Sequence, residues 1–148
     1  MKRTLATLAG IVVAVVMIGA VQFVSHKLFA PAVMPDMNDP AVVRAFVMSM
    51  PISAFLMVLL SYMLGAFTGG IVAVRVAARV SPHTKPLVCA VIVGGFVLAA
   101  SLMNVMMIPH PIWFVVALLV VIPASTWLVL PVIYEQKCLK QRYSARQR

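Results

Sequence analysis

The chain has 148 residues, of which 64% are hydrophobic and only 10% are charged, and its formal net charge is +9. Soluble domains are about half apolar and about a quarter charged, so this composition excludes an ordinary water-soluble globular domain. Four long apolar stretches with short connections occupy nearly all of the sequence. They predict a single all-α, polytopic membrane domain over residues 1–148, with four transmembrane helices.

The first apolar stretch predicts a membrane span over about residues 5–28, directly after Lys2 and Arg3. A basic start followed by an apolar run is also typical of a cleaved secretory signal. Residues 5–24, however, are 20 consecutive residues without a charge, which is longer than a typical signal core. We therefore expect an uncleaved anchor that stays in the mature protein.

A short amphipathic helix is expected before the second span. Asp39 is a suitable N-cap, and the proline that follows it lacks the N–H that the first helical position leaves unpaired. Apolar residues then recur at helical spacing, namely Val42, Val43, Phe46, Val47 and Met50. The pattern predicts an interfacial segment over residues 39–50, followed by a span over residues 51–74. Alternatively, Pro51 kinks one long helix that continues to about residue 80, and the sequence leaves both arrangements open.

The third and fourth spans are predicted over residues 87–108 and 112–133. Little more than the turn at residues 109–111 joins them, so they should be antiparallel neighbours. The fourth stretch contains Pro123 and Pro131, either of which can bend the helix.

Lysine and arginine are distributed unevenly between the two sides of the predicted bundle. One side receives only Lys27 and Arg44. The other receives ten cations: Lys2, Arg3, Arg75, Arg79, Lys85, Lys137, Lys140, Arg142, Arg146 and Arg148. Because positive charge in short loops marks the cytoplasmic side, both termini are predicted to be cytoplasmic.

The basic tail over residues 134–148 is interpreted as a stop signal that also binds anionic lipid headgroups. An acidic cytoplasmic partner is the alternative. Membrane topology by itself accounts for these cations, so we expect no nucleic-acid binding.

Small residues predict where the helices pack, because close backbone approach and interhelical polar contacts hold helices together in lipid. Three of the four predicted spans carry small residues at four-residue spacing. The glycines among them are the packing candidates: Gly10, Gly65, Gly69, Gly70, Gly94 and Gly95. Folding of one compact bundle is the favoured use of these faces, and self-association is the alternative.

Polar residues inside a span are costly and therefore informative. Gln22 and Asn104 lie at similar depths in the first and third spans, and His110 follows in the next turn. We predict an interhelical hydrogen bond for Asn104 and expect His110 at the wet membrane interface, with contact of Gln22, Asn104 and His110 to a polar ligand or ion as the alternative. Ser and Tyr in the spans carry less signal, because they can bond to a nearby carbonyl or reach the interface. No catalytic, metal-ligand or haem pattern is recognisable, so we expect no enzyme activity, no cofactor and no metal.

Two segments, residues 65–70 and 107–114, resemble small, uncharacterised four-helix proteins of bacterial inner membranes. The resemblance implies the same fold and the same location, a multi-pass protein in the bacterial inner membrane. It brings no assigned activity.

The favoured function is a non-enzymatic structural or accessory component that packs with copies of itself or with a larger membrane partner. A small oligomeric transporter or channel is the alternative, and binding of a lipid or small molecule between helices is the third possibility. The sequence does not specify a substrate, a partner or a copy number.

Overall fold

The computed structural model describes residues 2–29, 38–80, 86–108, 110–131 and 133–134. Five helices form most of these residues. The helices are α1 (Lys2–Phe29), α2 (Pro40–Ser49), α3 (Ile52–Val80), α4 (Pro86–Met107) and α5 (Ile112–Trp127). The predicted all-α class is confirmed, and α1, α3 and α4 are long and apolar enough to cross a membrane. Predictions for the basic tail beyond residue 134 and for Lys85 fall outside the described residues.

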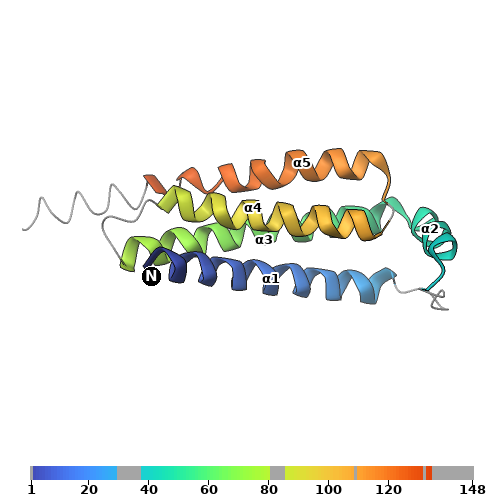
Figure 1. Ribbon diagram of the computed structural model, residues 1–148, viewed down its shortest axis with the longest axis horizontal. Coiled ribbons are helices and arrows are strands. Elements are labelled where there is room, and N and C mark those ends of the chain that lie inside the picture. The colour runs from blue at the N-terminus through green and yellow to red at the C-terminus, as the bar shows by residue number, and fades with distance from the viewer. Residues whose placement is uncertain (1, 30–37, 81–85, 109, 132, 135–148) are drawn as a thin grey trace, which may run out of the picture.

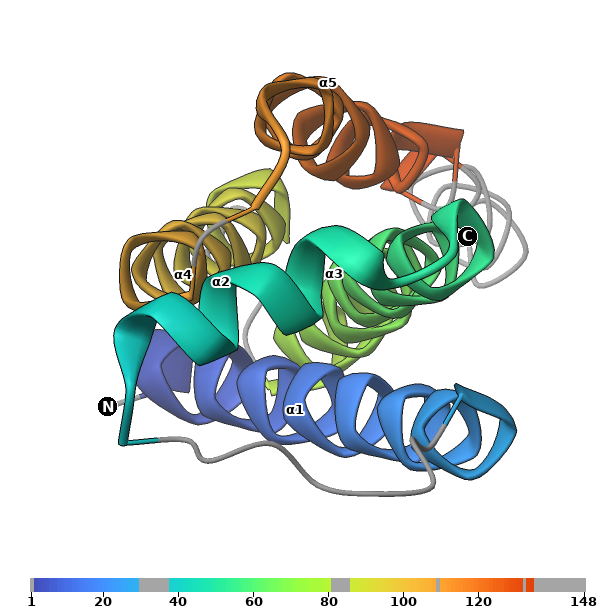
Figure 2. The ribbon, with the colours of Figure 1, turned by 90° about the vertical axis from the view of Figure 1, so that its right-hand side faces the viewer.

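The helix α3 lies at the centre of the bundle. It contacts α1, α4 and α5, while α4 also contacts α1 and α5. Successive long helices run in opposite directions, so the first and last described residues lie at the same end (Figure 1). The short helix α2 lies across the other end (Figure 2). We call these the terminal end and the α2 end.

Glycines bring α1 and α3 into close contact. A Cβ atom added to Gly69 would lie 2.6 Å from the Gly10 carbonyl oxygen and 2.8 Å from the Ala14 Cβ. A Cβ atom at Gly10 would likewise lie 2.7 Å from the Gly69 carbonyl oxygen, and one at Gly65 would collide with Ile18. Backbone therefore packs on backbone along this contact, as small residues in membrane helices allow.

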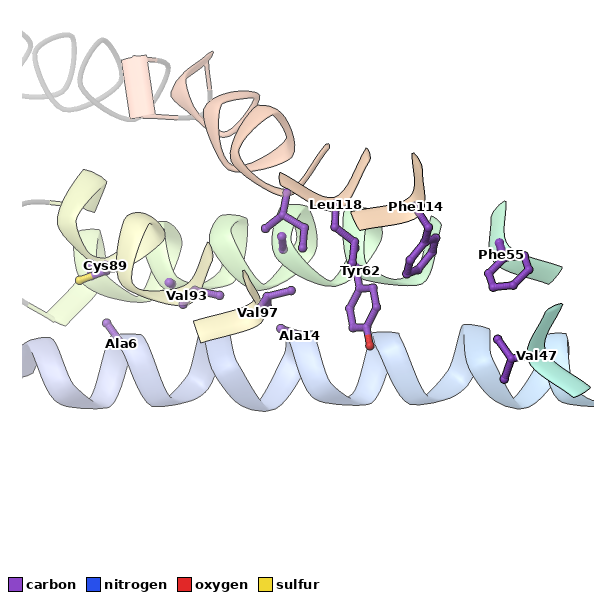
Figure 3. Packing of buried hydrophobic residues seen from close by; sticks show 14 of the residues in the cluster. Ala6, Ala14, Val47, Phe55, Tyr62, Cys89, Val93, Val97, Phe114 and Leu118 are labelled. Atoms are coloured by element: carbon purple, nitrogen blue, oxygen red, sulfur yellow. The ribbon is translucent and has the colours of Figure 1, made fainter. Parts of the chain in front are cut away.

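One buried cluster runs along most of the bundle (Figure 3). It extends from Ala6 and Cys89 near the terminal end to Phe55 and Val47 at the α2 end. The buried residues of α1 in this cluster are alanines, with Ile11 and Ile18 partly buried against it, whereas α5 contributes larger fully buried side chains such as Phe114. The core is thus narrow beside α1 and wider beside α5.

The structure decides between the two arrangements proposed for residues 39–50. The Asp39 carboxylate accepts a hydrogen bond of 2.8 Å from the Ala41 N–H, so α2 begins with the predicted cap. Met50 is extended, with φ −66° and ψ 141°, because the residue before a proline avoids the helical conformation. The helix α2 is therefore separate from α3, and a single kinked helix is excluded. Two of its residues, Val43 and Val47, are buried in the same cluster as Phe55.

The fourth predicted span differs from the expectation, since the continuous helix α5 ends at Trp127 instead of reaching residue 133. Its 16 residues are about 24 Å long, less than the roughly 30 Å of a bilayer core. After Trp127, the Val129 N–H bonds to the Thr126 carbonyl at 3.2 Å, which is a turn and not the α-helical pattern. Further along, Pro131 has no N–H to donate to the Trp127 carbonyl. Helical geometry resumes at residues 130–131 and 133–134. Pro123, by contrast, lies inside α5 without ending it.

Candidate functional site

The two amides singled out in the sequence meet a pair of adjacent residues on α3. Gln22 on α1 donates a hydrogen bond from Nε2 to the Ser61 hydroxyl at 3.4 Å. Asn104 on α4 donates from Nδ2 to the Tyr62 hydroxyl at 3.2 Å. We call these four residues the polar clasp, because they join α1 and α4 to the central helix.

The polar clasp is closed by hydrogen bonds to the protein itself. Ser61 and Tyr62 are buried, and the Ser61 hydroxyl donates to the Val58 carbonyl at 2.6 Å. Within the described part of the chain, no buried side-chain nitrogen or oxygen atom lacks a hydrogen-bond partner. Sequence reasoning missed Ser61 and Tyr62, because neither residue type is costly enough in a membrane to attract attention. The signal that could have identified them is their position in the predicted second span, at the same depth as the two amides in the predicted four-span arrangement.

His110 lies in an aromatic cluster at the α2 end. Its Nδ1 atom is 2.6 Å from the Ile108 carbonyl oxygen. The imidazole stacks on Phe114 with the ring centroids 4.9 Å apart, and Phe55 packs edge-on against it at 6.1 Å. Trp113 completes the cluster through edge contacts to both phenylalanines. These contacts make His110 part of the packing that closes this end of the bundle.

A groove of about 440 Å³ lies between α4 and α5. Its lining is Leu87, Val91, Gly94, Gly95, Leu98, Ile122, Pro123, Thr126, Trp127 and Leu130. The polar side-chain atoms of the lining belong to Thr126 and Trp127, and the Thr126 hydroxyl already donates to the Ile122 carbonyl at 3.0 Å. The groove therefore presents a largely apolar surface, to which Trp127 adds an indole N–H donor.

Two glycines of the groove differ in their surroundings. A Cβ atom at Gly94 would collide with Thr126, so this glycine permits the contact between α4 and α5. A Cβ atom at Gly95 would meet no atom within 4 Å, so the described part of the chain makes no close helix contact at this glycine. Of the remaining candidates, Gly70 lies beside Val129 on the segment after α5.

The charged side chains of the described residues lie near the two ends of the bundle. Arg3 at the start of α1 and Arg75 and Arg79 in the last turns of α3 are exposed near the terminal end. Lys27 and Arg44 are exposed at the α2 end. The apolar bodies of the helices lie between these two zones.

Comparisons with models of protein families, with curated proteins and with solved structures found no match to this chain. The function is therefore inferred from the chain's own geometry.

Proposed function

We propose that the chain is a four-span protein of a bacterial inner membrane, with both termini in the cytoplasm. Three helices have the required length and hydropathy. The fourth crossing would be made by residues 112–134, in which α5 and the helical turns after it extend beside α4 (Figure 1). The helix α2 would lie at the outer surface, with part of its apolar face packed on the bundle instead of on lipid.

We infer a non-enzymatic structural or accessory role in which this protein packs with a second copy or with a larger membrane protein. The observation that supports this role is the outward face of α4. Gly95 and Ala99 are one helical turn apart and exposed, and a Cβ atom at Gly95 would meet only open space. Small residues at this spacing let a second membrane helix approach closely, and in lipid such contact is a main source of helix association.

Substitution of Ala99 tests the role directly. In mild detergent, we expect the wild-type protein to migrate above its monomer mass of 16.0 kDa, either as an assembly of its own copies or in complex with a partner protein. Ala99→Leu should lower the cross-linked fraction in native membranes several-fold, because the larger side chain holds the second helix away. Ala20→Leu is the matched control, since Ala20 is an exposed small residue on α1. A monomeric wild-type protein, or equal cross-linking in both variants, would contradict the proposal.

The groove between α4 and α5 favours a second candidate function, the binding of an apolar molecule between helices. No comparable observation favours a transporter or channel. Gln22 and Asn104, for which contact with a polar ligand or ion was the alternative prediction, are engaged in the polar clasp.

A further inference from the structure

We propose that the groove between α4 and α5 binds one acyl chain of a membrane phospholipid from the leaflet at the terminal end. This inference rests on the membrane crossing proposed above and does not require assembly with another protein; because Gly95 lines the groove and also belongs to the face proposed for a second helix, an acyl chain and that helix would compete for Gly95. Three properties of the groove carry it: the chemistry of its lining, its length and its position along the bundle.

The lining matches a hydrocarbon chain. Eight of the ten lining residues have no polar side-chain atom; the Thr126 hydroxyl is bonded to the Ile122 carbonyl, and Trp127 adds only its indole N–H. A polar ligand would have to leave its own groups unpaired there, which is costly in a low-dielectric site. The volume of about 440 Å³ is in the range of small-ligand sites.

The length distinguishes an acyl chain from a spanning helix. Along α4 the lining extends from Leu87 to Leu98, which is roughly 17 Å at the helical rise per residue. That is about half of the roughly 30 Å bilayer core, the thickness of one leaflet. The lining of the groove does not continue past Leu98 along α4 toward the α2 end. A phospholipid chain reaches only from the interface to the midplane, as the groove does.

The position fits the same leaflet. Leu87 is the second residue of α4, so the groove opens where the bundle reaches the terminal end. Trp127 lines the groove, and tryptophan is enriched where membrane proteins meet the headgroup region. Exposed arginines on α3 mark the same end of the bundle. An acyl chain would thus enter from the headgroup layer and end near the midplane.

The two tryptophans of the chain allow a direct test. Trp127 lines the groove and is 74% exposed, whereas Trp113 is 42% exposed and lies at the α2 end. The variants Trp113→Phe and Trp127→Phe each leave one reporter. Each protein in detergent micelles is titrated with phosphatidylcholine that carries brominated acyl chains, which quench tryptophan emission on contact. We expect the Trp127 signal to saturate at about one phospholipid per chain, while Trp113 shows only gradual quenching.

A pair of adjacent residues supplies the matched control. Val91 lines the groove and is 54% exposed; its neighbour Ile92 is 49% exposed and does not line the groove. Val91→Phe should weaken the saturable quenching of Trp127 at least tenfold, because the ring occupies the groove. Ile92→Phe should leave the quenching unchanged. Because both side chains are exposed, both variants should fold.

Three results would overturn the acyl-chain site: equal, unsaturable quenching of both tryptophans, an unchanged Trp127 signal in Val91→Phe, or a protein segment cross-linked into the groove. Failure of the membrane crossing itself is distinguishable, because the wild-type protein would then stay in the supernatant after lysis without detergent. Failure of assembly would appear only in the Ala99→Leu comparison.

Discussion

At the residue scale, what matters most is where a glycine faces. Gly69 and Gly10 approach each other across the contact between α1 and α3, where a methyl group on either would strike the other's carbonyl oxygen. Gly19, on the same helix as Gly10, has no atom within 4 Å of an added Cβ. The same residue type thus closes one contact and is dispensable at another position, depending only on the rotation of the helix about its axis.

Overpacking typically costs about 1–3 kcal/mol, and Gly69→Leu should destabilise the bundle by at least that much, because the backbones of α1 and α3 must separate. Gly19→Leu should be neutral or slightly stabilising, since it removes the conformational freedom of an uncrowded helical glycine. Unfolding of the purified proteins in detergent, followed by circular dichroism, measures the difference. Equal stability of the two variants would show that the close contact is not needed.

At the scale of whole elements, prolines and caps set the boundaries. Pro51 separates α2 from α3, because its ring restricts Met50. The continuous helix α5 ends at Trp127 and is followed by a turn at residues 128–129. Pro123 lies inside α5 without ending it. Near it, the hydroxyl of Ser125 donates to the Ile122 carbonyl at 2.8 Å. The sequence predicted that Pro123 or Pro131 could bend the fourth span but did not show where the helix would end.

The helix α2 buries few side chains, so its cap should contribute a large share of its stability. Asp39→Ala removes the acceptor for the Ala41 N–H and should destabilise α2 by about 1 kcal/mol. Hydrogen exchange of the α2 amides should then accelerate, while exchange in α3 stays unchanged. Ser49→Ala, at the other end of α2, is the control, because the Ser49 hydroxyl bonds only to the Phe46 carbonyl of its own helix. Equal exchange in both variants would argue against a role for the cap.

At the scale of the whole molecule, the antiparallel order of the long helices places the first and last described residues on one side (Figure 1). The exposed arginines of α1 and α3 lie at that end. The proposed four crossings would put both termini on one side of the membrane, and the proposed cytoplasmic orientation of that side rests on the cation distribution.

Reporters fused to either terminus should accordingly read as cytoplasmic. Replacing the five tail cations with glutamine should lower the fraction of chains that keep the C-terminus inside, because those charges hold it there. They are Lys137, Lys140, Arg142, Arg146 and Arg148. Replacing Lys27 and Arg44 with glutamine should have no such effect. Reporters found in different compartments would contradict the four-span topology.

The sequence by itself determined the all-helical class, the separate helix before the second span as one of two alternatives, and the residue types available for packing. It could do so because hydropathy, prolines and caps act locally, within a few residues along the chain. Only the tertiary structure decided that Gln22 and Asn104 bond to Ser61 and Tyr62, that Gly95 faces open space, and that α4 and α5 leave an apolar groove. These outcomes depend on how each helix is rotated and how far it is shifted against its neighbours, and contacts from distant parts of the chain set both.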